Sequence, residues 1–153
     1  MIPSFAPTDI VTAESTRSAP LKWVVIVDKT VAPGRMVNAV ACISAATGAA
    51  VEGLIAHGGP DADGTQHPGL PWAGCSILTA GAEQLVNVRR KALEHEDILV
   101  VDMPVAAQTN RVYDEYLAEL STTRSADVAA VAISLIGPRA SVDAIVKRFS
   151  LLA

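Results

Sequence analysis

Apolar and polar positions alternate along the chain in blocks that predict strands and helices in turn. Residues 21–28, LKWVVIVD, form a continuous apolar run rich in Val and Ile, which is typical of a central strand covered on both faces. Further apolar runs predict strands over residues 75–79, 98–102 and 128–136. Apolar residues at helical spacing predict helices over residues 35–47, 81–94, 109–120 and 142–148.

Strands and helices therefore follow one another in the order β-α-loop-β-α-β-α-β-α. Such alternation favours a three-layer α/β/α domain around a four-stranded mixed sheet. Pro33 fits the first position of the first helix and Gly48 fits its end. Thr109 and Ser141 are expected to be the N-cap residues of the last two helices.

Two segments lack this periodicity. Residues 1–20 contain three prolines and many Ser and Thr, so we expect a flexible N-terminal tail ahead of a single domain over residues 21–153. The stretch HGGPDADGTQHPGLPWAG, residues 57–74, has too many Gly and Pro for regular structure. A loop of that length is usually functional or mobile, and residues 61–64 within it should form a turn.

Composition narrows the functional classes. The core must be built from Val, Ile, Leu and Ala, because half of the residues are apolar and only 4 % are aromatic. A net charge of −4 argues against nonspecific nucleic-acid binding, and the basic cluster at residues 89–91 is predicted to be a solvated helix face. Cys42 and Cys75 should be reduced, partly buried thiols.

Neither a membrane span nor a signal peptide is expected. No apolar run approaches the ~18 residues of a membrane-spanning helix. The N-terminus lacks a basic start and an apolar segment behind it. We therefore predict a soluble cytoplasmic protein without a membrane partner.

The candidate chemistry gathers at the carboxyl ends of strands, where α/β sheets bind ligands. Asp28 and Asp102 each end a predicted strand, and Gly34-Arg35 opens a helix whose free N–H groups favour anions. Arg35 adds a permanent charge with forked donors. These groups form one polar site, or each acid braces its own loop and Arg35 pairs with Asp28 or Glu52.

Two further polar residues follow Asp102. Gln108 could aim its amide into the same cleft, and Thr109 could act there or simply cap its helix. No glycine-rich phosphate loop and no nucleophile elbow occurs in the sequence.

A metal centre is not expected. His57, Asp61, Asp63 and His67 are loosely spaced, and no predicted helix or strand fixes them relative to one another. A metal site needs a defined number and geometry of ligands. We therefore predict no metal and no cofactor.

Three segments carry a family resemblance: WVVIVDKTVAPGRMVNAVA, VVDMPVAAQT and VAISLIGPRASVDAIVKRFSLLA. Together they resemble the peptidyl-tRNA hydrolase type II fold from about Lys22 to Leu152. A closer resemblance is to an uncharacterised bacterial family on that fold, known only as domain of unknown function 2000. Its members share the Gly-Arg-x-x-Asn start, the DADG-like turn and the Ile-Gly-Pro ending.

The resemblance implies candidate site residues. The hydrolases carry Gly-Lys at the first helix, a Gln four residues after the Lys and a His three further on. Here Gly34 matches, while Arg35, Ala39 and Cys42 stand at the other three positions. An Asp followed closely by Thr and Gln in the hydrolases is similar to Asp102, Gln108 and Thr109, with altered spacing and order.

The favoured interpretation is a cleft that binds a small anionic or amide-bearing ligand, with Asp28, Gly34 and Asn38 as binding residues. In the second, an ester or amide hydrolase, Asp102 activates water, Arg35 stabilises the oxyanion and Gln108 or Asn38 positions the carbonyl. Thr109 completes that catalytic set. The acidic charge and the departures from the hydrolase motif make tRNA a doubtful substrate.

The third interpretation is a non-catalytic interaction module. Dimers are common for the fold that the chain resembles, so a homodimer is expected. Exposed apolar residues such as Leu70 and Trp72 could supply part of its interface.

Overall fold

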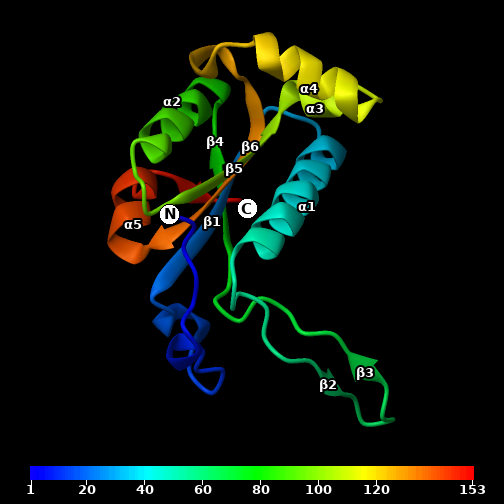
Figure 1. Ribbon diagram of the computed structural model, residues 1–153, viewed down its shortest axis with the longest axis vertical. Coiled ribbons are helices and arrows are strands. Elements are labelled where there is room, and N and C mark those ends of the chain that lie inside the picture. The colour runs from blue at the N-terminus through cyan, green and yellow to red at the C-terminus, as the bar shows by residue number, and fades with distance from the viewer.

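A five-stranded mixed sheet forms the centre of the computed structural model, which describes residues 1–153 (Figure 1). Its strands lie in the order β5-β6-β1-β4-β7. They are β1 (Leu21–Asp28), β4 (Ser76–Ala80), β5 (Leu99–Pro104), β6 (Ala130–Pro138) and β7 (Ser150–Leu151). The prediction of an α/β domain is confirmed, but the predicted number of four strands was wrong. The two-residue β7 is too short to leave a periodic signal.

The pairing of the strands decides which ends meet. β1 is parallel to β4 and antiparallel to β6, and β6 is antiparallel to β5. The carboxyl ends of β1, β4 and β5 therefore share one edge of the sheet. β7 pairs antiparallel with β4 through Leu151 and Ser150.

Helices cover both faces of this sheet. α1 (Pro33–Ala50) covers one face, and α2 (Ala82–Leu93) and α5 (Arg139–Val146) cover the other (Figure 1). Two short helices, α3 (Val105–Thr109) and α4 (Tyr113–Thr122), lie at the carboxyl edge. Three 3₁₀ turns are also present, at Pro7–Asp9, Thr16–Ser18 and Ser125–Asp127.

Several predicted helix ends shift. Pro33 opens α1 as expected, but the helix continues through Gly48 to Ala50, because two further alanines follow the glycine. Thr109 ends α3 and caps nothing, and α4 begins only at Tyr113. Ser141 lies inside α5, where its hydroxyl donates to Asp97 at 2.9 Å.

Alternation along the strands divides the core into two clusters. On the α1 face, Val25 and Val27 pack with Ile43 of α1, and on the other face Ile26 and Ile133 pack with Leu85 of α2. All six are at most 2 % exposed.

A buried polar chain crosses the α1 cluster. The Trp23 indole N–H lies 2.8 Å from Ser134 Oγ, and that oxygen lies 2.8 Å from Thr47 Oγ1. Thr47 donates in turn to the Ile43 carbonyl at 2.7 Å. Each polar atom therefore has a partner, which is what burial demands.

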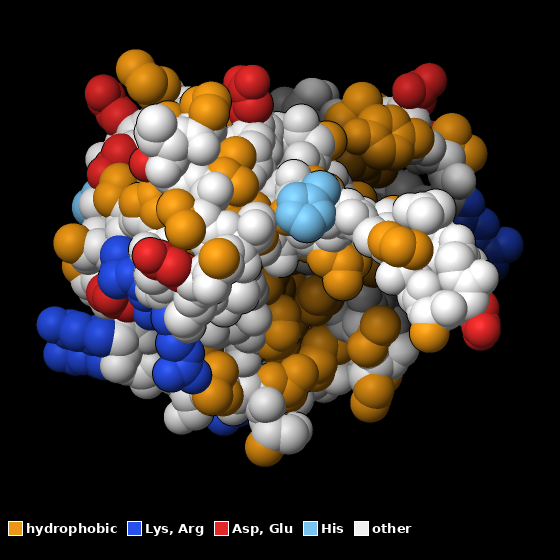
Figure 2. All heavy atoms as spheres, turned by 90° about the horizontal axis from the view of Figure 1, so that it is seen from below, with side chains coloured by type: hydrophobic (Ala, Val, Ile, Leu, Met, Phe, Trp, Pro, Cys, Tyr) orange, Lys and Arg blue, Asp and Glu red, His pale blue; other side chains and the backbone are white.

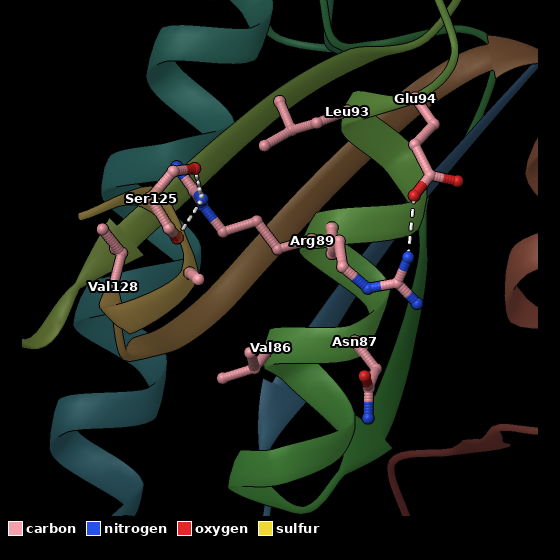
Figure 3. A pocket seen from close by; sticks show the side chains of 9 residues that line it. Val86, Asn87, Arg89, Leu93, Glu94, Ser125 and Val128 are labelled. Carbon is pink, nitrogen blue, oxygen red and sulfur yellow. Dashed lines mark hydrogen bonds and ion pairs between the residues drawn. The ribbon is translucent and has the colours of Figure 1, made fainter.

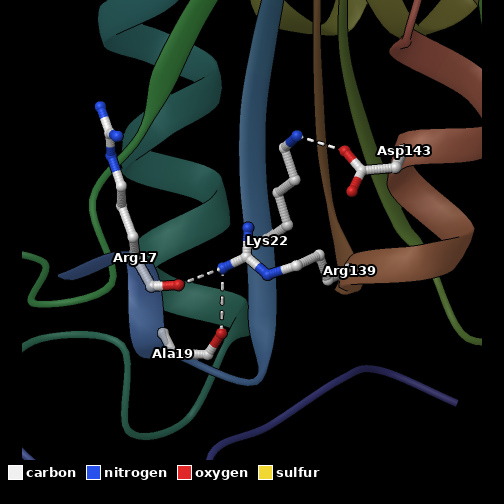
Figure 4. A network of polar contacts seen from close by, with 5 residues as sticks. All are labelled: Arg17, Ala19, Lys22, Arg139 and Asp143. Atoms are coloured by element: carbon white, nitrogen blue, oxygen red, sulfur yellow. Dashed lines mark hydrogen bonds and ion pairs between the residues drawn. The ribbon is translucent and has the colours of Figure 1, made fainter. Parts of the chain in front are cut away.

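The N-terminal segment lies against the lower end of the body. Phe5 is buried, with its ring centroid 4.9 Å from that of Trp72. Arg139 donates to the carbonyls of Arg17 and Ala19, and Lys22 pairs with Asp143 close by (Figure 4). These contacts anchor residues 1–20, and the mobility and domain division predicted for them stay predictions.

The Gly/Pro-rich stretch is not irregular, which corrects our expectation. Residues 55–71 form a hairpin that projects from the body below α1, and we call it the arm (Figure 1). Its strands are β2 (Gly59–Pro60) and β3 (Gln66–His67), with an isolated bridge between Ile55 and Pro71 at the base. A Cβ on Gly69 would lie 1.7 Å from the Ala56 carbonyl oxygen, and one on Gly58 2.0 Å from that of His67. The glycines thus permit the two strands to approach.

The tip of the arm is the turn that the DADG motif predicted. The Asp61 carboxylate accepts hydrogen bonds from the amides of Asp63 and Thr65, both at 2.9 Å. Trp72, proposed for an interface, is only 7 % exposed and donates to the Gly53 carbonyl, so that assignment was wrong. Leu70 on the arm is 75 % exposed.

Candidate functional site

A cleft of about 470 Å³ opens at the carboxyl edge of the sheet, on its α1 face. It runs between α1, β5 and the two short helices α3 and α4. Its walls are formed by Asn38, Cys42, Ile43, Ala46, Val101, Asp102, Met103, Pro104, Ala107, Asn110, Arg111, Tyr113 and Tyr116.

The floor of the cleft is apolar. Val101 and Met103 alternate along β5 toward the α1 face, where they meet Ile43. Pro104 and Ala107 extend this surface into α3. A floor of this kind would hold the apolar part of a ligand through burial alone.

One wall carries a network of amides. The Arg35 Nε–H donates to Gln108 Oε1 at 3.0 Å. The Gln108 amide nitrogen donates to Asn38 Oδ1 at 3.0 Å and to the Arg35 carbonyl at 2.9 Å. Three residues that the sequence singled out are therefore brought together, with Asn38 lining the cleft and the other two bonded behind it. Arg35 forms no ion pair with Asp28 or Glu52.

The opposite wall carries two tyrosines and an arginine. The rings of Tyr113 and Tyr116 meet edge to face, with centroids 5.5 Å apart. Burial is the main cause that raises the pKa of Tyr116, followed by the nearby Tyr113 and Asp102. The phenol therefore stays a neutral hydrogen-bonding group at physiological pH. Arg111 is exposed and forms no hydrogen bond or ion pair within the chain.

The sequence analysis missed this wall. Tyr113 and Tyr116 fall within the helix predicted over residues 109–120, where they belong to its apolar stripe, and no role was predicted for Arg111. Arg111 follows Asn110 in the short linker between α3 and α4, and the break of one predicted helix into two is what brings it to the cleft. A signal was present, since the β-branched Val112 and polar Asn110 are poor helix formers.

Neither acidic candidate joins the amide network, which corrects the expected single cluster. Asp102 lines the cleft, but its carboxylate is bound to Arg89, and Asp28 does not line the cleft at all. Asp102 pairs across the sheet with Ile133, in the cluster beneath α2, and its Oδ2 lies 2.5 Å from Arg89 Nε. Asp28 accepts from the amide and hydroxyl of Thr30, at 2.8 and 2.7 Å, and so braces its own loop. Strand ends meet at one edge, but side chains alternate between the two faces along each strand, so strand ends that meet need not bring their side chains together.

The remaining candidates are easily placed. Thr109 donates within its helix to the carbonyls of Val105 and Ala106, both at 3.3 Å, and it does not line the cleft. Gly34 is exposed in the first turn of α1, with open space around it.

A second hollow, of about 350 Å³, lies between α2 and the turn at Ser125–Asp127 (Figure 3). Arg89 crosses it and donates to the Ser125 carbonyl and hydroxyl, both at 3.0 Å. Arg90 pairs with Glu94 one turn further on. Arg89 thus connects α2 to β5 and to the Ser125 turn, and our prediction that it lies on a solvated helix face was wrong. Its guanidinium is already bonded within the chain and is not available to a ligand in this hollow.

The cysteines and histidines are dispersed. Cys42 and Cys75 both have exposed surface, so the expectation of partial burial was wrong for Cys42. Local desolvation nevertheless raises the pKa of Cys75 to about 12. His67 Nε2 lies 3.2 Å from Asp61 Oδ2, but no three His, Cys, Asp or Glu side chains are grouped as metal ligands. None of the helices is both long enough and apolar enough to cross a bilayer.

Comparison with known proteins places the chain in a family. The model of the family described as protein of unknown function DUF2000 matches residues 21–153, so the chain belongs to that family. The resemblance to this family is thereby confirmed.

One solved structure is similar: the protein of unknown function Atu0240 from Agrobacterium tumefaciens strain C58. The TM-score is 0.75 at 20 % identity, over 88 % of this chain and 98 % of that one. This likeness shows the fold alone. No curated protein matches the chain.

Proposed function

We propose that the cleft between α1 and α4 binds a small molecule with an apolar body and an amide or carboxylate head group. One observation carries this proposal: an apolar floor ends in a convergent set of polar groups of which one, Arg111, has no partner in its own chain. Small-molecule sites typically combine such a floor with a few polar groups that fix orientation.

The head group would contact the two polar walls. Asn38 offers an amide that is held in place by Gln108, which Arg35 holds in turn. Arg111 offers planar, forked donors that suit a carboxylate. The edges of Tyr113 and Tyr116 suit an aromatic or acyl body.

The hydrolase alternative has less support. The carboxylate of Asp102 is engaged by Arg89, and the hydroxyl of Thr109 is engaged by its own helix. Catalytic roles for Arg35, Asp102, Gln108 and Thr109 stay predictions, as do ligand contacts by Asp28 and Gly34. The assignment to the peptidyl-tRNA hydrolase type II fold is likewise part of the proposal, supported by the three sequence segments.

Thermal unfolding with matched ligand pairs tests the proposal. The probes are indole-3-acetate with indole-3-acetamide, and 4-phenylbutyrate with 4-phenylbutyramide. A ligand that binds only the folded protein stabilises it by about 2.7 kcal/mol at a hundredfold excess over Kd. We expect at least one pair to raise the Tm.

Variants then assign the contacts. Asn38→Ala should reduce the shift for acid and amide alike, and Arg35→Ala should reduce it less, because Arg35 acts through Gln108. Arg111→Ala should reduce the shift for the acids selectively. Asn87→Ala and Arg124→Ala, an exposed asparagine and an exposed arginine away from the cleft, are matched controls. Equal shifts in Asn38→Ala and in the wild type would contradict the proposal.

A further inference from the structure

The outer surface of α1, the longest helix, is almost free of charge. After Arg35 the helix contains no Asp, Glu, Lys or Arg up to its end at Ala50. Its solvent-facing residues are apolar and mostly small, at Val37, Ala41, Ala45 and Ala49. Val37 is 67 % exposed. The solvent-facing side of a surface helix normally carries charged and polar residues.

The arm continues from the carboxyl end of this helix. It contributes two exposed apolar side chains, since Ile55 is 50 % and Leu70 75 % exposed. Its tip carries Asp61 and Asp63, and no Lys or Arg occurs between Met36 and Val88. Figure 2, seen from the arm end, shows hydrophobic side chains gathered in a hollow near the middle of the view. The arm is thus an acidic, partly apolar projection.

The opposite end of α1 has the complementary character. Arg35 is hydrogen-bonded to an amide but to no carboxylate, and Arg111 has no partner. Val112 and Tyr113 beside them are 50 % and 72 % exposed. The acidic Asp114 and Glu115 of α4 do not line the cleft that Tyr113 and Tyr116 line.

We propose that two copies of this chain pair across a two-fold axis, with their α1 helices antiparallel and each arm lying over the partner's cleft. Antiparallel pairing brings the carboxyl end of one α1, where the arm starts, beside the amino end of the other. The distance from Ala50 to Arg35 along the helix is about 22 Å. The arm from Ile55 to Asp61 spans about 20 Å, so its tip can reach the partner's Arg111.

Both parts of the contact are needed. A stable interface buries about 800 Å² on each partner. The outer face of an 18-residue helix, roughly 27 Å long and 10 Å wide, supplies only about a third of that area. The arm and the α4 surface that receives it supply the remainder. The acidic tip against an arginine pair fixes the orientation of the two copies.

This arrangement makes the partner's arm a wall of the cleft. Asp63 of one copy would approach Arg111 of the other and compete with a ligand carboxylate for it. This second step rests on the proposed function, whereas the dimer itself does not. Binding of a carboxylate would therefore be coupled to the position of the arm.

Sedimentation and light scattering at micromolar concentration test the dimer. Asp63→Arg and Arg111→Asp should each weaken dimerisation by about tenfold or more, and the double variant should restore it. Ala45→Glu at the centre of the α1 face should also separate the copies. Arg124→Asp and Ala144→Glu should leave the dimer intact, because Arg124 lies outside the contact and Ala144 is exposed on α5, at the other face of the sheet. Circular dichroism checks that each variant is folded.

The outcomes separate this inference from the proposed function. A wild-type monomer, or a dimer indifferent to the Asp63 and Arg111 exchange, would overturn the arm contact. Melting shifts with indole-3-acetate or 4-phenylbutyrate in the monomeric Asp63→Arg variant would still support the cleft as a binding site. If the charge exchange between Asp63 and Arg111 restores the dimer but no probe raises the Tm, the interface is supported and the proposed ligand binding is contradicted.

Discussion

The helices that cover the two faces of the sheet differ in the residues that they expose to solvent. On one face, α2 and α5 bury their apolar sides and present charged residues outward, among them Arg90, Lys91 and Glu94. On the other face, α1 buries Ala39, Ile43 and Thr47 and presents more apolar residues outward. Both inner surfaces consist of buried apolar residues, so the contrast concerns the outer surfaces of the helices.

The comparison teaches where to look for function. A helix with a charged outer surface needs no further cover, whereas an uncharged outer surface exposes apolar area that an interface would bury. The cleft, the amide network and the arm all lie on the α1 side of the sheet. The carboxylates of Asp102 and Asp28 are bonded to Arg89 and Thr30, outside the amide network.

The largest expected effect is that of Ile133→Ala, which tests how tightly the α2 face is packed. Ile133 is fully buried on the α2 face, and a truncation of this kind costs about 2–5 kcal/mol because a cavity remains. Urea unfolding should show this loss, and Ile133→Val should cost only about 0.5–1.5 kcal/mol. A loss under 1 kcal/mol for the alanine variant would mean that the α2 face is loosely packed.

The adjacent residue of β6 tests the α1 face. Ser134→Ala removes the oxygen that accepts from Trp23 and contacts Thr47. The buried indole N–H is left unsatisfied, which costs about 1–3 kcal/mol. Urea unfolding measures it against Ser121→Ala, an exposed serine that should change stability by less than about 0.5 kcal/mol. Equal values for both serines would show that the buried chain adds nothing.

Asp102→Ala separates a structural from a catalytic role. The side chains of Asp102 and Arg89 are 23 % and 18 % exposed, so the pair lies between surface and buried pairs. We expect a loss of about 1–2 kcal/mol, measured by urea unfolding. Asp114→Ala, on an exposed acid without an ion-pair partner, is the control. An unchanged free energy of unfolding would argue against a structural role and would favour a catalytic role for Asp102.

The smallest effect concerns the arm. His67 is the main cause that lowers the pKa of Asp61 below its ordinary 3.8, followed by the backbone amide of Thr65. A lowered pKa stabilises the turn above pH 3.8 and loses that contribution as the pH falls through the lowered value. Carboxyl NMR titration of His67→Ala should show the pKa of Asp61 rising toward 3.8. A pKa that stays low would assign the shift to backbone donors alone.

Much of the fold could be predicted because burial leaves a strong trace in sequence. The strand at residues 21–28 was predicted with its observed bounds, since a strand covered on both faces is continuously apolar. The arm was missed because its strands are held by backbone bonds and glycines, without an apolar pattern. β7 was missed because two residues carry no period.

The site was predicted only in part. Arg35, Asn38 and Gln108 come from segments about 70 residues apart, and the expected position of ligand sites at the carboxyl ends of strands suggested that they meet. The expected cluster of Asp28 and Asp102 with Arg35 was wrong because it rested on the edge at which their strands end. It did not take into account toward which face of the sheet each side chain points. The position of Arg111 depends on a helix break whose exact place no periodicity gives.

The two glycines at the root of the arm have an evolutionary consequence. Any side chain at Gly69 or Gly58 would collide with the opposite backbone. Natural variation among relatives should therefore accumulate at the tip of the hairpin and spare its root. A lineage that lost these glycines would have to abandon the whole projection, and with it the partnership between subunits that we infer.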